Sequence, residues 1–597
     1  MSRGGWAHDG GGQPLDWRLL RRLWPFVRPH GVAFALGIGV MGLASVAKLA
    51  GPYLLKLAID GPIARGNPRG VIPYAVLFLA AQLLEGVLEA AQAMLVRIRG
   101  EDVLRSLRSA LFAKAQRLPA AYLDATPSGR ILSRITADVA VLSDLFSSGV
   151  AALVGDILLL VGILAAMAHL DPYLALLAYG SLPVLLVSSE VFRRRLRSVY
   201  RATREKTARL TGRLQELLRG VNVLRIFAAE RWADAELGKA NAEHRDAFLR
   251  SVTLYALFFP LVELVSALTV ALLLWQGGGA VVREAVTFGV LVAFLEYLQK
   301  FFRPVRDLSE KYNVLQASMA AAERITDFLD LPEEPAGGKA RIPLAGSLEL
   351  DRVGFAYDGG PPVLREVSFS LAPGEVVALV GPTGSGKSTL VSLLLGFRRP
   401  CSGTVRMDGR ELGELDPGAL REQMALVPQE VFLFQGSVLD NITLGRPGIG
   451  RDAAEAAARA VGLHDAVASL PQGYDTQVLE EGALLSAGQR QLVAFARALA
   501  GNPRLLILDE ATSEIDQATE AAIESALVTL LRGRTSLVVA HRLATVRRAD
   551  RVVVLARGQV AEQGTHRELL SRPGLYRTLY ELQFRRTESG EPVGNSP

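Results

Sequence analysis

The run GPTGSGKST, Gly381–Thr389, has the residue types and spacing of a loop that binds phosphate groups. It follows a β-branched stretch, Glu375–Leu379, and precedes a helical stretch, LVSLLLG, which is the setting that such a loop requires. Glycine lets backbone N–H groups approach phosphate oxygens, and the start of the helix adds partial positive charge. We therefore expect the phosphates of a nucleotide to be bound by Gly381, Thr383, Gly384, Ser385, Gly386, Lys387, Ser388 and Thr389.

Two side chains of this loop are expected to have separate roles. Lys387 should reach the β- and γ-phosphates, and the hydroxyl of Ser388 should bind Mg²⁺. The chain is rich in arginine, and Lys387 is its only lysine after Lys339. A lysine at this one position is expected if the site requires a compact ammonium group rather than a planar guanidinium.

The segment Arg504–Glu510, RLLILDE, predicts a buried strand that ends in two carboxylates. Asp509 is expected to hold Mg²⁺, and Glu510 is expected to polarise the water that attacks the γ-phosphate. A lone Asp-Glu pair commonly caps a helix instead. Four apolar residues before the pair, and a phosphate loop upstream of it, favour the catalytic interpretation.

The first half of the chain has six stretches that are apolar enough to cross a hydrocarbon layer about 30 Å thick, which takes roughly 20 helical residues. The sixth is the weakest, because Glu296, Lys300 and Arg303 interrupt it. The six expected spans are 31–60, 71–96, 144–170, 172–192, 251–275 and 284–304.

The positive charges predict how these spans are oriented. The stretches 97–143 and 193–250 carry eight and fifteen Lys or Arg residues, whereas the connections 61–70, 168–172 and 276–286 carry two, none and one. Because positively charged segments stay in the cytoplasm, both long stretches, both termini and the C-terminal half are expected there. Each long stretch is expected to be helical, with a short transverse helix near 119–134 or 217–232.

The remaining segments complete the expected organisation. Residues 15–28 interleave tryptophan and phenylalanine with arginine, which is typical of a helix at a membrane surface; a solvated amphipathic helix is the alternative. Beyond a linker, short apolar runs alternate with helical patterns and predict an α/β domain. The predicted parts are a flexible N-terminus (1–14), an interfacial elbow helix (15–30), a six-span all-α transmembrane domain (31–330), a linker (331–345), an α/β P-loop nucleotide-binding domain (346–583) and a polar tail (584–597).

Composition excludes several other classes of protein. Of 597 residues, 50% are apolar, which is high for an ordinary soluble enzyme. The net charge of +6 is small for this length, so nucleic acid is not expected as a partner. The single cysteine, Cys401, excludes an intrachain disulfide and a cysteine-rich metal site.

From residue 15 to about 583, the chain resembles the ATP-binding-cassette (ABC) proteins, in particular half-size exporters of the multidrug and lipid type. Seven motifs occur in the order typical of that family. They are Tyr357, the phosphate loop, Gln429 in LVPQE, the signature Leu485–Gln489 (LSAGQ), the strand Leu505–Glu510, the D-loop Ser513–Asp516 (SEID), and His541 in VVAHR.

The resemblance implies a role for each of these positions. Tyr357 stacks on adenine, Gln429 links Mg²⁺ to the membrane domain, and His541 senses the γ-phosphate beside the catalytic Glu510. It also implies that two cassettes dimerise head-to-tail, so that each signature completes the ATP site of the partner. Contacts with that ATP are implied for Ser486, Gly488, Gln489 and Asp516.

The signature departs from the family pattern at one position. Ala487 replaces the first glycine of the usual Leu-Ser-Gly-Gly-Gln, and a methyl group there should weaken the contact with phosphate. Because the chain's own Lys387, Glu510 and His541 are intact, we expect a heterodimer with a similar subunit whose own Walker B site is degenerate. A homodimer that tolerates the alanine is the alternative.

The expected activity is ATP-driven export of hydrophobic or amphiphilic compounds across a bacterial cytoplasmic membrane by alternating access. A dedicated lipid or peptide translocator would share every motif. A non-transporting ATP-gated regulator is disfavoured by the intact Glu510 and His541, and an importer is disfavoured because importers keep cassette and membrane domain on separate chains. Ionisable groups within spans are often functional, so Glu263 and Glu296 are candidates for binding cationic cargo; pairing with a neighbouring helix is the alternative.

Overall fold

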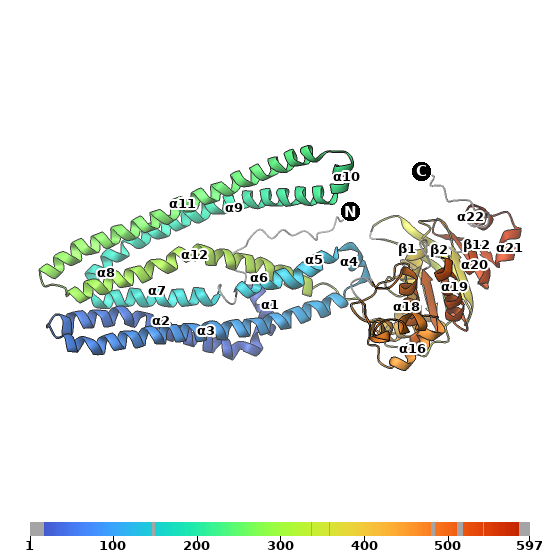
Figure 1. The fold of residues 1–597 in the computed structure, drawn as a ribbon, viewed down its shortest axis with the longest axis horizontal. Coiled ribbons are helices and arrows are strands. Elements are labelled where there is room, and N and C mark those ends of the chain that lie inside the picture. Colours follow the sequence, from blue (N-terminus) through green and yellow to red (C-terminus); the bar gives the residue numbers. More distant parts are fainter. Residues whose placement is uncertain are drawn as a thin grey trace. The chain divides into compact units, whose positions relative to one another are not determined.

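The fold was analysed in a computed structural model, which describes residues 17–145, 150–335, 337–357, 359–478, 484–509, 517–540 and 543–583. The chain divides into two compact units. One comprises Met1–Leu118 and Thr126–Pro332 and is helical throughout its described residues, and the other comprises Pro119–Ala125 and Glu333–Pro597 and combines helices with strands (Figure 1).

The helical unit consists of long helices joined by short connections. Its α-helices are α1 (Trp17–Val27), α2 (Gly31–Ala58), α3 (Pro68–Gln116), α5 (Ser128–Ser133), α6 (Val139–Asp144), α7 (Val150–Leu170), α8 (Pro172–Tyr179), α9 (Ser181–Arg219), α10 (Val221–Ile226), α11 (Glu230–Val282) and α12 (Phe288–Leu329). A 3₁₀ turn, η1 (Arg28–His30), precedes α2, and π-helical turns extend α2 (η2, Ile59–Ile63) and join α5 to α6 (η3, Arg134–Asp138).

Side-chain caps start the helices that follow the three short connections. Asn67 accepts a hydrogen bond from the Gly70 N–H, and Asp171 accepts one from the Leu174 N–H; each precedes a proline at the first helical position. Thr287 caps α12 in the same way through the Val290 N–H. These residues satisfy N–H groups that a helix start leaves without partners, so the sequence itself fixes where the chain turns back.

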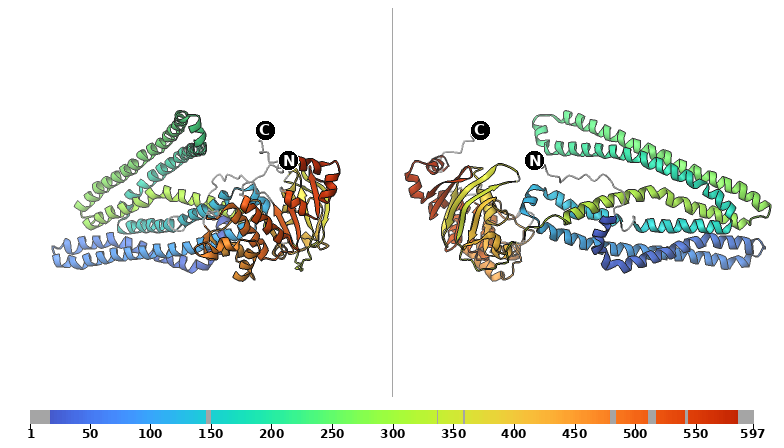
Figure 2. Two further views of the ribbon diagram at one scale, coloured as in Figure 1. Left: turned by 45° about the vertical axis from the view of Figure 1, so that its right-hand side comes forward. Right: turned by 180° about the vertical axis from the view of Figure 1, so that it is seen from behind.

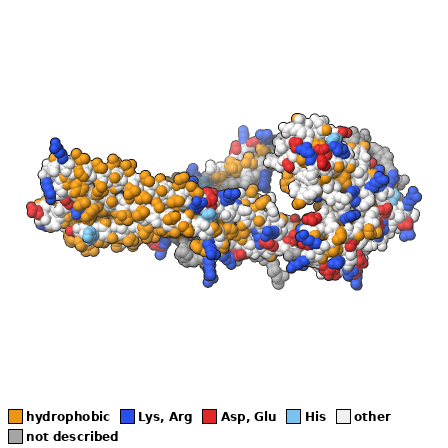
Figure 3. All heavy atoms as spheres, turned by 90° about the horizontal axis from the view of Figure 1, so that it is seen from below, with side chains coloured by type: hydrophobic (Ala, Val, Ile, Leu, Met, Phe, Trp, Pro, Cys, Tyr) orange, Lys and Arg blue, Asp and Glu red, His pale blue; other side chains and the backbone are white. Residues whose placement is uncertain are grey.

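Five helical stretches in the described part of the chain are long and apolar enough to cross a membrane: Arg21–Ile63, Pro68–Gln116, Leu153–Leu170, Pro172–Arg219 and Glu230–Val282. The sixth predicted span falls in α12, which lies in the core of the unit, where Phe294, Tyr297 and Phe302 are buried. By contrast, α2 and α3 expose many apolar side chains, and one face of these helices is largely hydrophobic (Figure 3). Such a face suits contact with lipid tails.

The helices α3, α9 and α11 continue far beyond the length needed to cross a bilayer. The pair α9 and α11 runs side by side up to the short helix α10 (Figures 1 and 2). Charged side chains join the two: Lys206 Nζ lies 2.6 Å from a carboxylate oxygen of Glu243, and Arg213 Nη2 lies 2.9 Å from one of Glu236. The polar contacts mark these ends as parts that lie in water.

The second unit is built around a mainly parallel sheet. Its order is β12-β11-β3-β10-β9-β6, and only β12, at the edge, is antiparallel. The six strands are β3 (Val376–Val380), β6 (Met424–Val427), β9 (Leu505–Asp509), β10 (Thr535–Val539), β11 (Arg551–Ala556) and β12 (Gln559–Gly564). Buried apolar runs such as LLILD and TSLVV are what a sheet covered on both faces requires.

Two smaller sheets and the remaining helices surround this core. The antiparallel sheet has the order β2-β1-β4-β5, with β1 (Leu348–Ala356), β2 (Pro362–Leu371), β4 (Ser402–Met407) and β5 (Arg410–Glu411), while β7 (Gly436–Ser437) pairs with β8 (Gln477–Val478). The α-helices are α4 (Ala120–Ala125), α13 (Lys387–Leu394), α14 (Pro417–Glu422), α15 (Val438–Thr443), α16 (Arg451–Ala460), α17 (His464–Ala468), α18 (Ala487–Ala500), α19 (Gln517–Leu531), α20 (Leu543–Arg548), α21 (His566–Ser571) and α22 (Leu575–Gln583), with 3₁₀ turns at Leu412–Glu414 and Gly473–Asp475.

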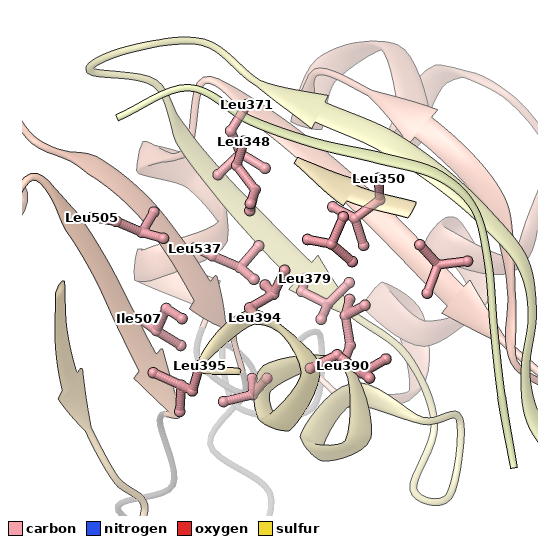
Figure 4. Packing of buried hydrophobic residues seen from close by; sticks show 14 of the residues in the cluster. Leu348, Leu350, Leu371, Leu379, Leu390, Leu394, Leu395, Leu505, Ile507 and Leu537 are labelled. Carbon is pink, nitrogen blue, oxygen red and sulfur yellow. The ribbon is translucent and has the colours of Figure 1, made fainter. Parts of the chain in front are cut away.

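Two hydrophobic clusters hold the second unit together. In the first, Leu390 and Leu394 of α13 pack against Leu379, Ile507 and Leu537 of the parallel sheet (Figure 4). The second cluster joins α15, α16, α18 and α19 to the sheet's other residues. The phosphate loop therefore sits on the first cluster and the signature on the second.

Candidate functional site

Four segments that carry or precede predicted site residues lie at the carboxyl ends of parallel strands, at one edge of the central sheet. The phosphate loop follows β3, Asp509 ends β9, and Gln429 comes two residues after β6. Ala540, the last described residue before His541, follows β10, which lies between β3 and β9. Ligands of open α/β sheets bind at this carboxyl edge, so the topology brings the phosphate loop, Asp509 and Gln429 to the same edge of the sheet.

The phosphate loop has a backbone that only glycine supports at two points. Gly384 has φ +78° and Gly386 has φ +104°. A Cβ on Gly386 would lie 2.7 Å from Leu364 Cδ2, and a Cβ on Gly381 would lie 2.1 Å from the Leu555 carbonyl oxygen. The conformation and the packing thus explain these three glycines without reference to a ligand.

Lys387 begins α13, and its side chain is folded back into the loop. Its Nζ donates hydrogen bonds to the carbonyl oxygens of Gly381, at 2.7 Å, and Pro382, at 3.2 Å. The residue is 8% exposed, and this burial lowers the pKa of Lys387, while the nearby Asp509 carboxylate acts in the opposite direction. The ammonium group is therefore held at the mouth of the loop, where incoming phosphate oxygens could replace the two carbonyls as acceptors.

Ser385 gives an independent indication that the loop binds a ligand. Its hydroxyl oxygen is buried and has no hydrogen-bond partner among the described residues. Buried polar atoms are rarely left unpaired, because losing the hydrogen bond to water costs about 1–3 kcal/mol. A phosphate oxygen in the loop would satisfy it. Ser388 is exposed in the first turn of α13, as a metal-binding hydroxyl must be.

Tyr357 comes directly after β1 and is tied to the loop. Its hydroxyl lies 2.9 Å from Thr389 Oγ1 in α13, and the residue is 41% exposed. The neighbouring Phe355 ring packs against it at nearly a right angle, with the centroids 5.1 Å apart. A partly exposed aromatic ring fixed beside a phosphate loop is a suitable surface for a nucleotide base.

The signature forms the start of α18. Ser486 and Gln489 form a reciprocal capping box, in which Ser486 Oγ accepts from the Gln489 N–H and Gln489 Oε1 accepts from the Ser486 N–H. The Ala487 methyl group is exposed in the first turn, and Gly488 is buried. Among the described residues, no hydrogen bond joins the signature to the chain's own phosphate loop.

Three predicted site residues, Glu510, Asp516 and His541, lie outside the described residues, as do the D-loop and residues 479–483 before the signature. Sequence reasoning missed one residue near the site, Arg398, whose guanidinium carbon lies 4.7 Å from the centroid of the Tyr357 ring. Its partner in an ion pair, Asp124, is 274 residues away in the sequence, so no local signal could have found it.

The helical unit holds a charged cavity of about 360 Å³ between α2, α3 and α7. Lys48, Glu89, Arg97 and Asp156 line it, beside apolar residues such as Met41 and Leu159.

Two charged residues that lie within the predicted spans 31–60 and 144–170 are paired here. Lys48 forms an ion pair with Glu89, and Asp156 forms one with Lys311 of α12. Outside the cavity, Glu190 is paired with Arg193 and Arg194 on its own helix. Arg97 has no ion pair with a described residue, Glu263 is exposed, and Glu296 is partly buried.

Comparison with known proteins gave two family matches. Residues 34–305 match the ABC transporter transmembrane region, and residues 364–513 match the ABC transporter family. Together these matches cover more than half of the chain.

Relatives of similar length agree with the family matches. The chain is 35% identical over 589 residues to an ATP-dependent lipid A-core flippase of Alkalilimnicola ehrlichii, with 98% of this chain and 99% of the relative covered. It is 37% identical to a fatty acid ABC transporter ATP-binding/permease protein of Mycobacterium tuberculosis, with 94% and 95% covered. Among solved structures, a bacterial Atm1-family ABC exporter with ATP bound gives a TM-score of 0.77 at 26% identity, covering 97% of this chain and all of that one.

Proposed function

The chain belongs to the ABC transporter family, and from this premise we propose that it is one half of a heterodimeric exporter that moves hydrophobic or amphiphilic compounds across a bacterial cytoplasmic membrane. The predicted fold, a helical membrane domain fused to an α/β nucleotide-binding domain, is confirmed, and the chain is an ATP-hydrolysing transporter of the exporter type. The phosphate loop supports ATP as the energy source of this exporter, because Lys387 is buried in it and the Ser385 hydroxyl has no hydrogen-bond partner among the described residues.

ATP binding follows from the groups that the described residues present. The base stacks on Tyr357, the triphosphate enters the loop, the Lys387 ammonium exchanges two backbone carbonyls for phosphate oxygens, and the Ser385 hydroxyl gains a partner. Glu510 polarises the attacking water, and His541 contacts the γ-phosphate. In the dimer, Asp516 and the signature residues Ser486, Gly488 and Gln489 contact the ATP held by the partner.

The oxygen groups at the sheet edge fit Mg²⁺. Ser388, Asp509 and Gln429 offer a hydroxyl, a carboxylate and an amide oxygen, the donor types that Mg²⁺ prefers. When bound, the ion neutralises phosphate charge.

Transport follows from a shift between two conformations. ATP held by the phosphate loop of one subunit and the signature of the other favours the closed pair of cassettes. The short helices α4 and α10 are suited to relay that closure, because each lies between two long helical segments of the chain. The cavity in the membrane then opens to the exterior, and hydrolysis resets it.

Ala487 supports a heterodimer. Its exposed methyl group stands at the first turn of α18, where the signature would approach the partner's phosphate, while the chain's own Lys387 and Glu510 are present. Purification of the tagged chain with the products of neighbouring genes tests this. A similar but non-identical subunit in equal amount is expected, and a homodimer with full ATP turnover would contradict it.

Two candidate sites predict opposite charges for the cargo. Arg97 lines the charged cavity and has no ion pair with a described residue, which favours an anionic head, and the names of the two relatives, a lipid A-core flippase and a fatty acid transporter, support a lipid. Glu263 and Glu296 would instead bind a cation.

Transport into inside-out vesicles distinguishes these. We expect Arg97→Gln to slow ATP-dependent uptake of a fluorescent fatty acid, with uptake of a lipophilic cation tested in parallel on Glu263→Gln and Glu296→Gln. If Arg97→Gln transports the fatty acid like the wild type, the anionic-head proposal is wrong. If ATP hydrolysis drives uptake of neither probe nor of phospholipid, the chain is a regulator rather than a pump.

A further inference from the structure

One guanidinium group joins the short helix α4 to the aromatic ring beside the phosphate loop. Arg398 follows α13, and its side chain is only 14% exposed. Its Nη2 donates a hydrogen bond to Asp124 Oδ2 of α4 at 2.5 Å. On its other side, its guanidinium carbon lies 4.7 Å from the centroid of the Tyr357 ring and 6.0 Å from that of Phe355.

The Tyr357 ring is therefore held from three directions. The cation of Arg398 lies over the ring, Phe355 packs against it at nearly a right angle, and the Tyr357 hydroxyl hydrogen bonds with Thr389 in α13. Part of the ring remains exposed. The orientation of the Tyr357 ring therefore depends on the position of the Arg398 guanidinium, and a nucleotide base can stack on the ring only in a suitable orientation.

We propose that Arg398 is a positioning residue that makes base binding on Tyr357 depend on the docking of α4. The proposal rests on the assignment of ATP to the phosphate loop. Asp124 fixes the guanidinium over the ring by an ion pair, and a guanidinium on an aromatic face is attracted to it by the ring's quadrupole. When α4 moves away, the guanidinium loses its anionic partner and the ring loses its support.

The dependence runs in both directions. If docking of α4 strengthens base binding, a bound base strengthens docking of α4 by the same factor. The ends of α4 lead directly into α3 and α5 of the helical unit. Through Arg398, occupancy of the base surface is thereby linked to the positions of α3, which lines the charged cavity, and of α5, separately from the phosphate contacts.

The test compares a ligand that has a base with one that lacks it. Affinities of the purified full-length chain, with its partner subunit if one copurifies, are measured for ATP and for inorganic tripolyphosphate, using displacement of a fluorescent ATP analogue. The variants are Asp124→Asn, Arg398→Gln, the double variant, and the matched control Arg399→Gln. The control removes the same charge one residue away, at an exposed side chain with no ion pair among the described residues.

We expect Asp124→Asn to raise the dissociation constant for ATP about two- to fivefold, the range of an exposed ion pair. Arg398→Gln should raise it about three- to thirtyfold, because the cation over the ring is also lost. The double variant should be no weaker than Arg398→Gln alone. Tripolyphosphate should bind all variants equally, which a general structural defect would not produce, and Arg399→Gln should behave as wild type.

Three results would overturn the proposal: unchanged ATP affinity in Asp124→Asn, an equal loss of affinity for tripolyphosphate, or the same effect from Arg399→Gln. Because Asp124 is 66% exposed, its substitution by Asn does not endanger folding. If the wild-type chain bound neither ATP nor tripolyphosphate, the assignment of the phosphate loop would fail first, and the role of Arg398 with it.

Discussion

Replacement of Lys387 by methionine should separate nucleotide binding from folding. Methionine keeps most of the buried stem and removes the ammonium, which donates to the Gly381 and Pro382 carbonyl oxygens. A hydrogen bond that involves a charged group contributes about 1.5–3 kcal/mol. Loss of about 2 kcal/mol corresponds to a roughly 30-fold weaker affinity for ATP.

The size of the expected effect on thermal unfolding follows from the coupling between ATP binding and the free energy of unfolding. At an ATP concentration of about 100 times the wild-type dissociation constant, ligand binding stabilises the native state by about 2.7 kcal/mol. After a roughly 30-fold loss of affinity, the same concentration is only about three times the dissociation constant and contributes about 0.9 kcal/mol. Without ATP, the two proteins should unfold at similar temperatures, because removing a buried charge offsets the lost hydrogen bonds.

The assay is thermal unfolding of the purified chain in detergent, with and without MgATP. Lys339→Met is the matched control, because Lys339 is the nearest other lysine along the chain and is exposed. The variant should lose most of the ATP-induced shift, and the control should keep it. A full shift in Lys387→Met would refute the assignment of the ammonium to the phosphates.

Three further predictions test other parts of the structure. Gly386→Ala should weaken ATP binding at least tenfold, because φ +104° and Leu364 leave no room for Cβ, whereas Gly374→Ala, at φ +81° in open space, should leave ATP binding unchanged in the same titration. Ser486→Ala and Thr565→Ala each remove a capping box and should cost about 1 kcal/mol on thermal unfolding, but only the former should weaken binding of the ATP held by the partner subunit. Asp408 accepts hydrogen bonds from residues 345–347; burial alone would raise the pKa of Asp408, but these bonds outweigh it and hold the pKa below its usual value. Its contribution, about 1–2 kcal/mol, is therefore present above pH ~4 and lost as the pH falls through the folded pKa, so the stability difference between wild type and Asp408→Asn, followed from pH 7 to pH 3, should shrink.

Local patterns predicted much of the fold. The apolar run before Gly381 is β3, and the run before Asp509 is β9, because a strand buried on both faces must be continuously apolar. Helix α2 ends at Ala58 and its π-helical extension ends at Ile63, close to residue 60, the predicted end of the first span. The break between α8 and α9 at Gly180 was not predicted, since the apolar pattern runs through it.

Contacts between residues far apart in the chain could not be predicted from the sequence. The sixth predicted span is less apolar than the others because α12 packs inside the helical unit, and Tyr297 and Lys300 donate hydrogen bonds to carbonyl oxygens of α2. Likewise, the link between Asp124 and Arg398 requires the fold to exist first. Conversely, the roles of Glu510, Asp516 and His541 rest on the sequence motifs alone and remain predictions.

ATP-driven uptake in the Glu510→Gln variant is the most direct test of the central claim, that hydrolysis at this chain's cassette powers movement of cargo through its helices. The purified chain and its partner are reconstituted in lipid vesicles, and ATP turnover and uptake of a fluorescent fatty acid are measured together. The account predicts that Glu510→Gln still binds ATP but loses both turnover and uptake by at least a hundredfold, as expected when a general base is removed. Wild-type rates of hydrolysis or uptake in this variant would contradict it.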